Sequence, residues 1–266
     1  MENNTSWNGK GYGWMNRKYG WKPDVPNQQD RLYLSYKQEK IKKFPTSINL
    51  ISKMPPVYDQ LDLGSCVLNA TAGALEYDRI IQGIDDWTPS RLFMYYNVRV
   101  MEGSVSSDSG ATVRDAIKSV SKQGAPPETM WPYDTSKFEN RPPIAAYKEA
   151  SKHLAIQYLR VDNSQINEIK QCLVAGFPII FGMSVYESFE SNGVAKTGKV
   201  PMPSSSEKMV GGHSMDICGY SDTSKCFIVR NSWSASWGDH GYCYVPYAYL
   251  TSTAMADDFW TIRKVN

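Results

Sequence analysis

The chain has 266 residues, 41% hydrophobic and 12% aromatic, which is enough to bury a large core in one big domain or in two lobes. Its formal net charge of +2 gives no sign of nucleic-acid binding, and the absence of an 18-residue apolar run or a signal-peptide layout predicts no membrane partner. Five cysteines, an odd number without clustered spacing, argue against a disulfide framework and a metal site, and favour the cytoplasm or another reducing compartment.

Residues 1–45 form an N-terminal extension that is rich in Gly and Trp and then in Pro. Three tryptophans, Trp7, Trp14 and Trp21, fall seven residues apart, but the intervening glycines argue against a helix. A segment with large aromatic side chains and no core of its own is expected to fill a groove or cross an edge of the main domain. Two interpretations stay open: a structural strap, or a short prosegment that covers an active-site cleft. Residues 31–43 are predicted to form a turn or two of helix.

Helices dominate the chain after residue 46. Apolar residues at helical spacing and glycines at the expected ends predict three helices. Thr112 and Asp115 resemble a capping box at the start of the third. The predicted helices cover residues 66–83, 91–102 and 112–124.

The second half of the chain changes to short apolar runs separated by turns, which are typical of strands. A helix capped by Ser164 is predicted among them, and residues 195–212 are predicted to be a long mobile loop. We therefore expect an α+β fold in a domain of residues 46–266, with a helical lobe at about 60–130, a β lobe at about 145–266 that is an antiparallel sheet or barrel, and a cleft between them. The predicted strands cover residues 154–161, 178–185, 214–220, 226–230 and 241–246.

Cys66 is the candidate nucleophile, because it stands where the first helix begins. A helix N-terminus offers unpaired N–H groups and a positive dipole end, and both favour the thiolate. Gln60 precedes it by six residues, with Gly64 and Ser65 making a tight bend between. The amide of Gln60 and the backbone N–H of Cys66 are then two donors for a developing oxyanion.

His213 is the candidate base among only three histidines. His153 lies in a charged helical run and His240 in a turn, whereas His213 follows two glycines and begins an apolar strand. Asn231, eighteen residues later, can accept the far N–H of the imidazole and fix its tautomer and plane. Trp233 or Trp237 is placed to shield that hydrogen bond from water.

These residues, in this order, resemble the papain and cathepsin family of cysteine peptidases. The resemblance implies a papain-like two-lobe fold, with Cys66 as nucleophile, His213 as general base and acid, and Asn231 as orienting group. It also implies an oxyanion hole made by Gln60 and the Cys66 N–H. Substrate contacts are implied at Ser109, Gly110, Ser214 and Trp233. The run Ser109-Gly110-Ala111 resembles the family's glycine wall, which pairs with the substrate backbone.

Three features depart from the family pattern. Leu63 stands where the family carries a second, disulfide-bonded cysteine, and Val67 stands where it carries an aromatic residue. The extension is also much shorter than a typical inhibitory prosegment.

We expect a monomeric endopeptidase that acts on proteins or peptides through a thioester and needs no cofactor, with the zymogen question open. The alternatives are a latent or peptide-binding homologue with a filled cleft, or another acyl transfer such as transpeptidation or deubiquitination.

Overall fold

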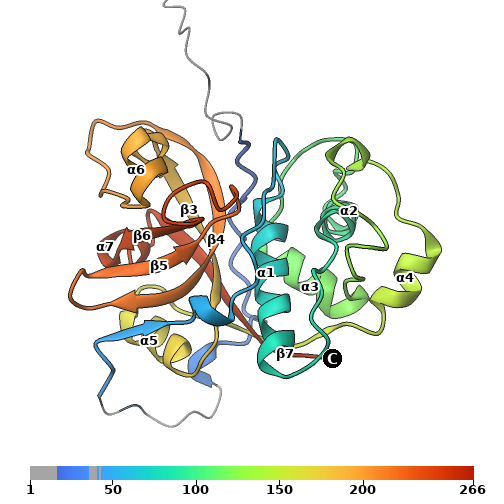
Figure 1. Cartoon of the computed structure of the whole chain (residues 1–266), viewed down its shortest axis with the longest axis horizontal. Helices are drawn as coiled ribbons and strands as arrows, with labels where there is room; N and C mark the ends of the chain where they lie inside the picture. The colour runs from blue at the N-terminus through green and yellow to red at the C-terminus, as the bar shows by residue number, and fades with distance from the viewer. Residues whose placement is uncertain (1–16, 36–40, 42) are drawn as a thin grey trace, which may run out of the picture.

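The computed structural model describes residues 17–35, 41 and 43–266, and these form two lobes that lie side by side (Figure 1). The helical lobe contains the first three predicted helices, all confirmed, and a short fourth helix. Ser90 caps α2 by accepting from Phe93 N, and Thr112 caps α3 by accepting from Asp115 N, each at 3.2 Å. The helices are α1 (Cys66–Ile81), α2 (Arg91–Met101), α3 (Val113–Gln123) and α4 (Ile144–Ala150).

The other lobe is built on an antiparallel sheet in the order β2-β7-β3-β4-β5-β6, with β1 pairing with β4. Short helices α5 (Ile166–Val174), α6 (Asn192–Thr197) and α7 (Tyr247–Leu250) accompany it. The single-turn 3-10 helices are η1 (Tyr33–Ser35), η2 (Ile51–Lys53), η3 (Thr135–Lys137) and η4 (Glu187–Glu190). The strands are β1 (Ser47–Asn49), β2 (Ala155–Arg160), β3 (Ile179–Tyr186), β4 (Met209–Ser221), β5 (Cys226–Arg230), β6 (Tyr242–Pro246) and β7 (Ala256–Val265).

Two predictions about this lobe were correct only in part. The predicted loop of residues 195–212 holds the end of α6 and the first four residues of β4, because Gly211 and Gly212 pair with β3. Ser164 does not cap α5; its hydroxyl and N–H both bond to the Asp162 carboxylate, and the helix begins after Gln165.

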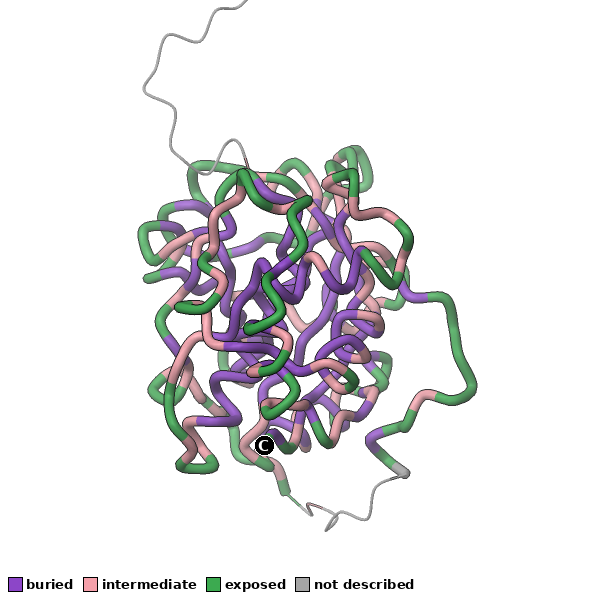
Figure 2. Tube along the Cα trace, turned by 90° about the vertical axis from the view of Figure 1, so that its right-hand side faces the viewer, coloured by how far each residue is buried: buried purple, intermediate pink, exposed green. Residues whose placement is uncertain are grey.

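The strand β7 was not predicted, although it joins the two lobes. Phe259 packs in the core of the sheet lobe, whereas Trp260, Ile262 and Val265 pack in the core of the helical lobe. In Figure 1 this strand leaves the sheet and ends beside the C-terminal end of α1. Figure 2 shows buried segments through the middle of the molecule and exposed segments around its outer loops.

The N-terminal segment runs between the lobes as the dark blue trace of Figure 1. Its Tyr33 is buried in the sheet lobe, and its Leu32 makes a β-bridge with Arg160. Of the helix predicted at residues 31–43, the structure shows η1; residues 36–40 and 42 lie outside the described residues, as do Trp7 and Trp14. No helix in the described part of the chain is long and apolar enough to cross a membrane.

Candidate active site

Cys66 is the first residue of α1 and is completely buried. A tight bend precedes it: Ser65 N donates to Leu63 O at 2.8 Å, and the Ser65 carbonyl accepts from the N–H groups of Leu68 and Asn69 in the first turn of the helix, each at 3.0 Å. The Ser65 hydroxyl lies 2.5 Å from the Tyr133 hydroxyl and 3.0 Å from Asn69 Nδ2, which fixes the bend to both helix and loop. The thiol is therefore held at a helix N-terminus, as the sequence predicts.

His213 lies on β4, and its imidazole is held by Asn231, the residue that follows β5. Nε2 is 2.7 Å from Asn231 Oδ1, which also accepts from the Ser232 N–H at 2.7 Å. The Trp233 ring lies 5.1 Å from the imidazole, tilted by 35°. The structure thus brings Asn231 and Trp233 onto the ring of His213. Nδ1, the other ring nitrogen, finds no hydrogen-bond partner among the described residues.

The sulfur of Cys66 is brought to the same strand by the backbone. It accepts from the N–H of Ser214, the residue next to His213, and from the N–H of Gly20. Burial nevertheless raises the pKa of the Cys66 thiol to about 11, since these N–H groups offset the lost hydration only in part. Burial lowers the pKa of His213 to about 4 against the opposing hydrogen bond to Asn231. Both groups are therefore neutral at pH 7 in this arrangement.

Gln60 lies beside the nucleophile and is held on three sides. Its N–H donates to Ser232 O at 2.9 Å, and its Oε1 accepts from the Ser232 hydroxyl at 2.7 Å. The remaining donor, Nε2, points to two carbonyls, Lys18 O at 2.9 Å and Leu63 O at 3.0 Å. A main-chain carbonyl of the N-terminal segment thus occupies the donor that the sequence assigns to the oxyanion hole.

We call residues 17–24, which cross the site, the strap. Its main chain is bound on both walls of the cleft: Ala111 N donates to Gly20 O at 2.8 Å, Lys22 N to Ala111 O at 3.0 Å, and Trp21 N to Gly212 O at 2.9 Å. A Cβ on Gly110 would lie 2.1 Å from Gly20 O, and one on Gly20 would lie 1.9 Å from Gly64 O. The close approach of these backbones requires glycine.

Two aromatic side chains of the strap lie on either side of Gly20. The Trp21 indole packs on Gly182, where a Cβ would lie 2.0 Å from the ring, and its Nε1 donates to Asp258 Oδ2 at 3.0 Å. It lies at the wall of a cavity of about 290 Å³ that Met255 and Ala256 also line. Tyr19 lies on the other side, with its ring 5.8 Å from that of His213 and 6.1 Å from that of Trp233.

Of the residues with implied substrate contacts, Ser214 and Gly110 lie at the Cys66 sulfur or the strap, whereas Ser109 does not. Ser214 contacts the Cys66 sulfur through its backbone, and Gly110 lies against Gly20. Ser109 instead directs its hydroxyl to Ser104, 2.8 Å away. The backbone hydrogen bonds to the strap come from Ala111, which ends the run compared with the family's glycine wall, and from Gly212, which sequence reasoning did not assign as a substrate contact.

The other histidines and cysteines lie apart from this cluster. His153 packs against Trp87 and bonds to Glu149 at 3.0 Å, and His240 is exposed in a turn with φ of 53°. All five cysteines lie within the described residues and are free thiols. Among the described residues no group of His, Cys, Asp and Glu is arranged to hold a metal ion.

Comparison with known proteins finds relatives over most of the chain. Residues 44–258 match the profile described as papain family cysteine protease. A peptidase C1-like protein of Acanthamoeba polyphaga mimivirus is 38% identical, over 94% of this chain and 88% of its own length. The crystal structure of xylellain, a cysteine protease from Xylella fastidiosa, has 37% identity and a TM-score of 0.86, covering 94% of this chain and 97% of its own.

A more distant structure, digestive procathepsin L 3 from the larval midgut of Tenebrio molitor, shares the fold at 19% identity and a TM-score of 0.68, covering 93% of this chain and 76% of its own. The predicted α+β papain-like fold is thereby confirmed. The chain belongs to the papain family of cysteine proteases, and it is a hydrolase of that family.

Proposed function

We propose that the protein is an endopeptidase that cleaves peptide bonds through a thioester on Cys66, and that the strap keeps it latent. In this proposal His213 is the general base and acid, Asn231 orients its imidazole, and Gln60 with the Cys66 N–H binds the oxyanion. Proteins or peptides are its substrates, and the chain acts as a monomer. Five free thiols support a reducing compartment.

The observation that carries the proposal is the strap itself. A peptide main chain lies against the nucleophile, with the Gly20 N–H on the sulfur and the Lys18 carbonyl on Gln60 Nε2. Hydrogen bonds to Ala111 and Gly212 hold that main chain on both walls. A cleft that binds a peptide backbone in this way fits extended polypeptide substrates.

The reaction follows from these groups. Once the strap has left, His213 takes the Cys66 proton, and the thiolate attacks the carbonyl carbon of the scissile bond. The carbonyl oxygen becomes an oxyanion at the site where Lys18 O accepts from Gln60. The imidazolium then protonates the leaving amine as the C–N bond breaks, and a thioester remains. His213 next removes a proton from water, which attacks the thioester, releases the acid product and restores the thiol.

Cleavage within a chain is supported by the path of the strap. It continues on both sides of Gly20, toward Trp233 through Tyr19 and toward Gly182 through Trp21. The cleft therefore accommodates peptide on both sides of the nucleophile, as an endopeptidase requires.

A head-to-tail cyclic, internally quenched peptide and its linear counterpart test this proposal, because only an endopeptidase opens a ring. Trp21→Ala removes the largest strap side chain from the cleft, and we expect this variant to cleave both peptides faster than the wild-type chain. Cys66→Ser should cleave neither. Cleavage of the linear peptide alone would indicate an exopeptidase. If Trp21→Ala cleaves neither peptide while Cys66 remains alkylatable, the protein is a peptide-binding homologue.

A further inference from the structure

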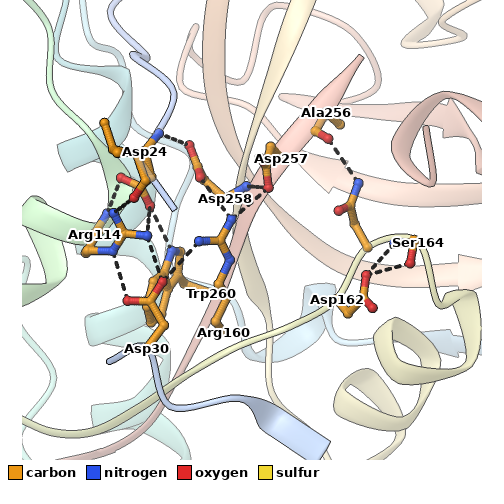
Figure 3. A network of polar contacts seen from close by, with 12 residues as sticks. Asp24, Asp30, Arg114, Arg160, Asp162, Ser164, Ala256, Asp257, Asp258 and Trp260 are labelled. Carbon is orange, nitrogen blue, oxygen red and sulfur yellow. Dashed lines mark hydrogen bonds and ion pairs between the residues drawn. The ribbon is translucent and has the colours of Figure 1, made fainter. Parts of the chain in front are cut away.

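Beyond the nucleophile, the N-terminal segment is fastened by a network of carboxylates and arginines (Figure 3). Arg114 of α3 donates to both oxygens of Asp30, at 2.9 and 2.7 Å, and Arg160 of β2 donates to Asp30 Oδ2 at 3.1 Å. Closer to the cleft, the Asp24 N–H donates to Asp258 Oδ2 at 2.8 Å, the same oxygen that accepts from Trp21. Asp258, on β7, thus binds two residues of the strap.

The carboxyl groups of Asp24 and Asp258 also meet. Asp258 is completely buried and Asp24 is 6% exposed, and their side chains are hydrogen-bonded to each other. Two carboxyl groups can form such a bond only if one of them carries a proton. Burial first, and then the neighbouring charge of Asp24, raise the pKa of Asp258 to about 7. Burial also raises the pKa of Asp24.

The charges that face this pair do not neutralise it. Arg114 Nη2 is 3.8 Å from Asp24, and Arg160 Nη2 is 3.5 Å from Asp258. Both guanidinium groups are closer to other carboxylates, Arg114 to Asp30 at 2.7 Å and Arg160 to Asp257 at 2.9 Å. Four carboxyl groups therefore share two guanidinium groups. Full ionisation leaves two negative charges in excess, and one shared proton removes one of them.

We propose that Asp24 and Asp258 form a proton-dependent latch, which holds the strap over Cys66 while the pair shares a proton and releases it as that proton is lost at neutral to alkaline pH. This inference rests on the proposed occlusion of Cys66 by the strap. Its two halves come from segments that separate when the cleft opens, so that opening exposes both carboxyl groups to water. The shared proton is then no longer favoured.

The direction follows from proton linkage. The closed form holds its extra proton up to about pH 7, whereas in the open form the pKa of Asp258 falls toward its ordinary value near 4. Closure is thus strongest below that ordinary value and is weakened as the pH rises through 7, at most about tenfold per pH unit for one proton. Asp30 acts in the opposite direction: burial opposes its ionisation, but hydrogen bonds from Arg114 and Arg160 prevail and lower its pKa. Its contribution to closure is present above pH 4 and is lost in stronger acid.

Alkylation of Cys66 by iodoacetamide in the full-length chain tests the latch, with each thiol quantified by peptide mass mapping. Asp258→Asn is the decisive variant, because asparagine resembles the protonated carboxyl, cannot ionise, and tolerates the left-handed backbone at this position, where φ is 59°. The ratio of the wild-type rate to the Asp258→Asn rate cancels the ionisation of Cys66 itself. We expect a ratio that already exceeds one at about pH 5.5, rises by at most about tenfold per pH unit up to about pH 7, and levels off above it. The ratio for Asp222→Asn, a carboxylate on the distant turn after β4, should stay near one.

Each other result overturns the inference in a recognisable way. If the ratio does not change with pH and both chains are labelled slowly at every pH, the strap covers Cys66 but the Asp24–Asp258 pair is not a latch. Fast labelling of a folded Asp258→Asn chain at every pH means that a charged carboxylate holds the strap. Fast labelling of the wild-type chain at every pH means that the strap does not cover Cys66. The proposed latency is then wrong, and the latch is wrong with it. Alkylation needs no peptidase activity, and the test therefore does not depend on substrate.

Discussion

Cys66 and His213 are both completely buried, and burial shifts their pKa values in opposite directions, so that the thiol and the imidazole are both neutral. A catalytic pair of this type needs thiolate and imidazolium. Both charged forms are disfavoured while the strap excludes water. The proposed occlusion would therefore block the peptide site and also lower the reactivity of the thiol.

The protonation state of His213 is the first prediction. In the full-length chain the ring should stay neutral down to about pH 4, because burial disfavours its cation. In Trp21→Ala, water reaches the cleft and the pKa of His213 should rise. Histidine NMR can follow this, because the chain has only three histidines and His240 provides an exposed reference signal. A His213 ring that is already charged at pH 6 in the wild-type chain would contradict the neutral resting pair.

Gln60→Ala should lower kcat about 100-fold with little change in KM, because its Nε2 donor serves the oxyanion more than the ground state. The measurement is made in the Trp21→Ala background, where the cleft is open to peptide. Gln82→Ala is the matched control, since that amide donates to Asp78 O at 2.9 Å at the far end of α1. If kcat falls equally in Gln60→Ala and Gln82→Ala, Gln60 is not part of the oxyanion hole.

Gly182→Ala should activate the protein. Its Cβ would lie 2.0 Å from the Trp21 ring, and overpacking of this kind costs roughly 1–3 kcal/mol. The side chain that can give way belongs to the strap, so we expect Cys66 alkylation at pH 6 to become about tenfold faster. Gly193→Ala is the control, because the nearest heavy atom to its Cβ would be 3.8 Å away. An unchanged rate in a folded Gly182→Ala chain would show that the indole does not hold the strap closed.

Gly73 lets α1 approach the sheet lobe behind the active site. A Cβ there would lie 2.7 Å from Arg230 Nη1 and 2.8 Å from Asp216 Oδ2, both completely or almost completely buried. Alanine stabilises an exposed helix by up to about 1 kcal/mol relative to glycine. Here we expect Gly73→Ala to lower the free energy of unfolding by roughly 1–3 kcal/mol, measured by urea denaturation. If Gly73→Ala instead raises the free energy of unfolding, the two lobes can move apart at this position without an energetic cost.

The sequence by itself determined the features that depend on residues close together in the chain. The three helices of the first half were predictable because apolar spacing, the caps at Ser90 and Thr112 and the terminal glycines are local signals. The papain-like fold was predictable because Gln60, Cys66, His213 and Asn231 follow one another in the family's order. The place of Cys66 was predictable because it starts a helix that has local signals. The pairing of His213 with Asn231 was predictable because one lies on a strand and the other follows the next strand.

Only the tertiary structure decided what occupies the cleft. Trp21 and Asp258 are 237 residues apart, and neither carries a local signal for the hydrogen bond between them. The strand β7 was missed because its outward residues include charged ones, while its apolar residues divide between two cores. Gly212 was placed in a loop because glycine is a turn signal in sequence, whereas here the missing side chain makes room for the strap. Long-range packing gives these residues their roles, and no pattern of neighbouring residues encodes such packing.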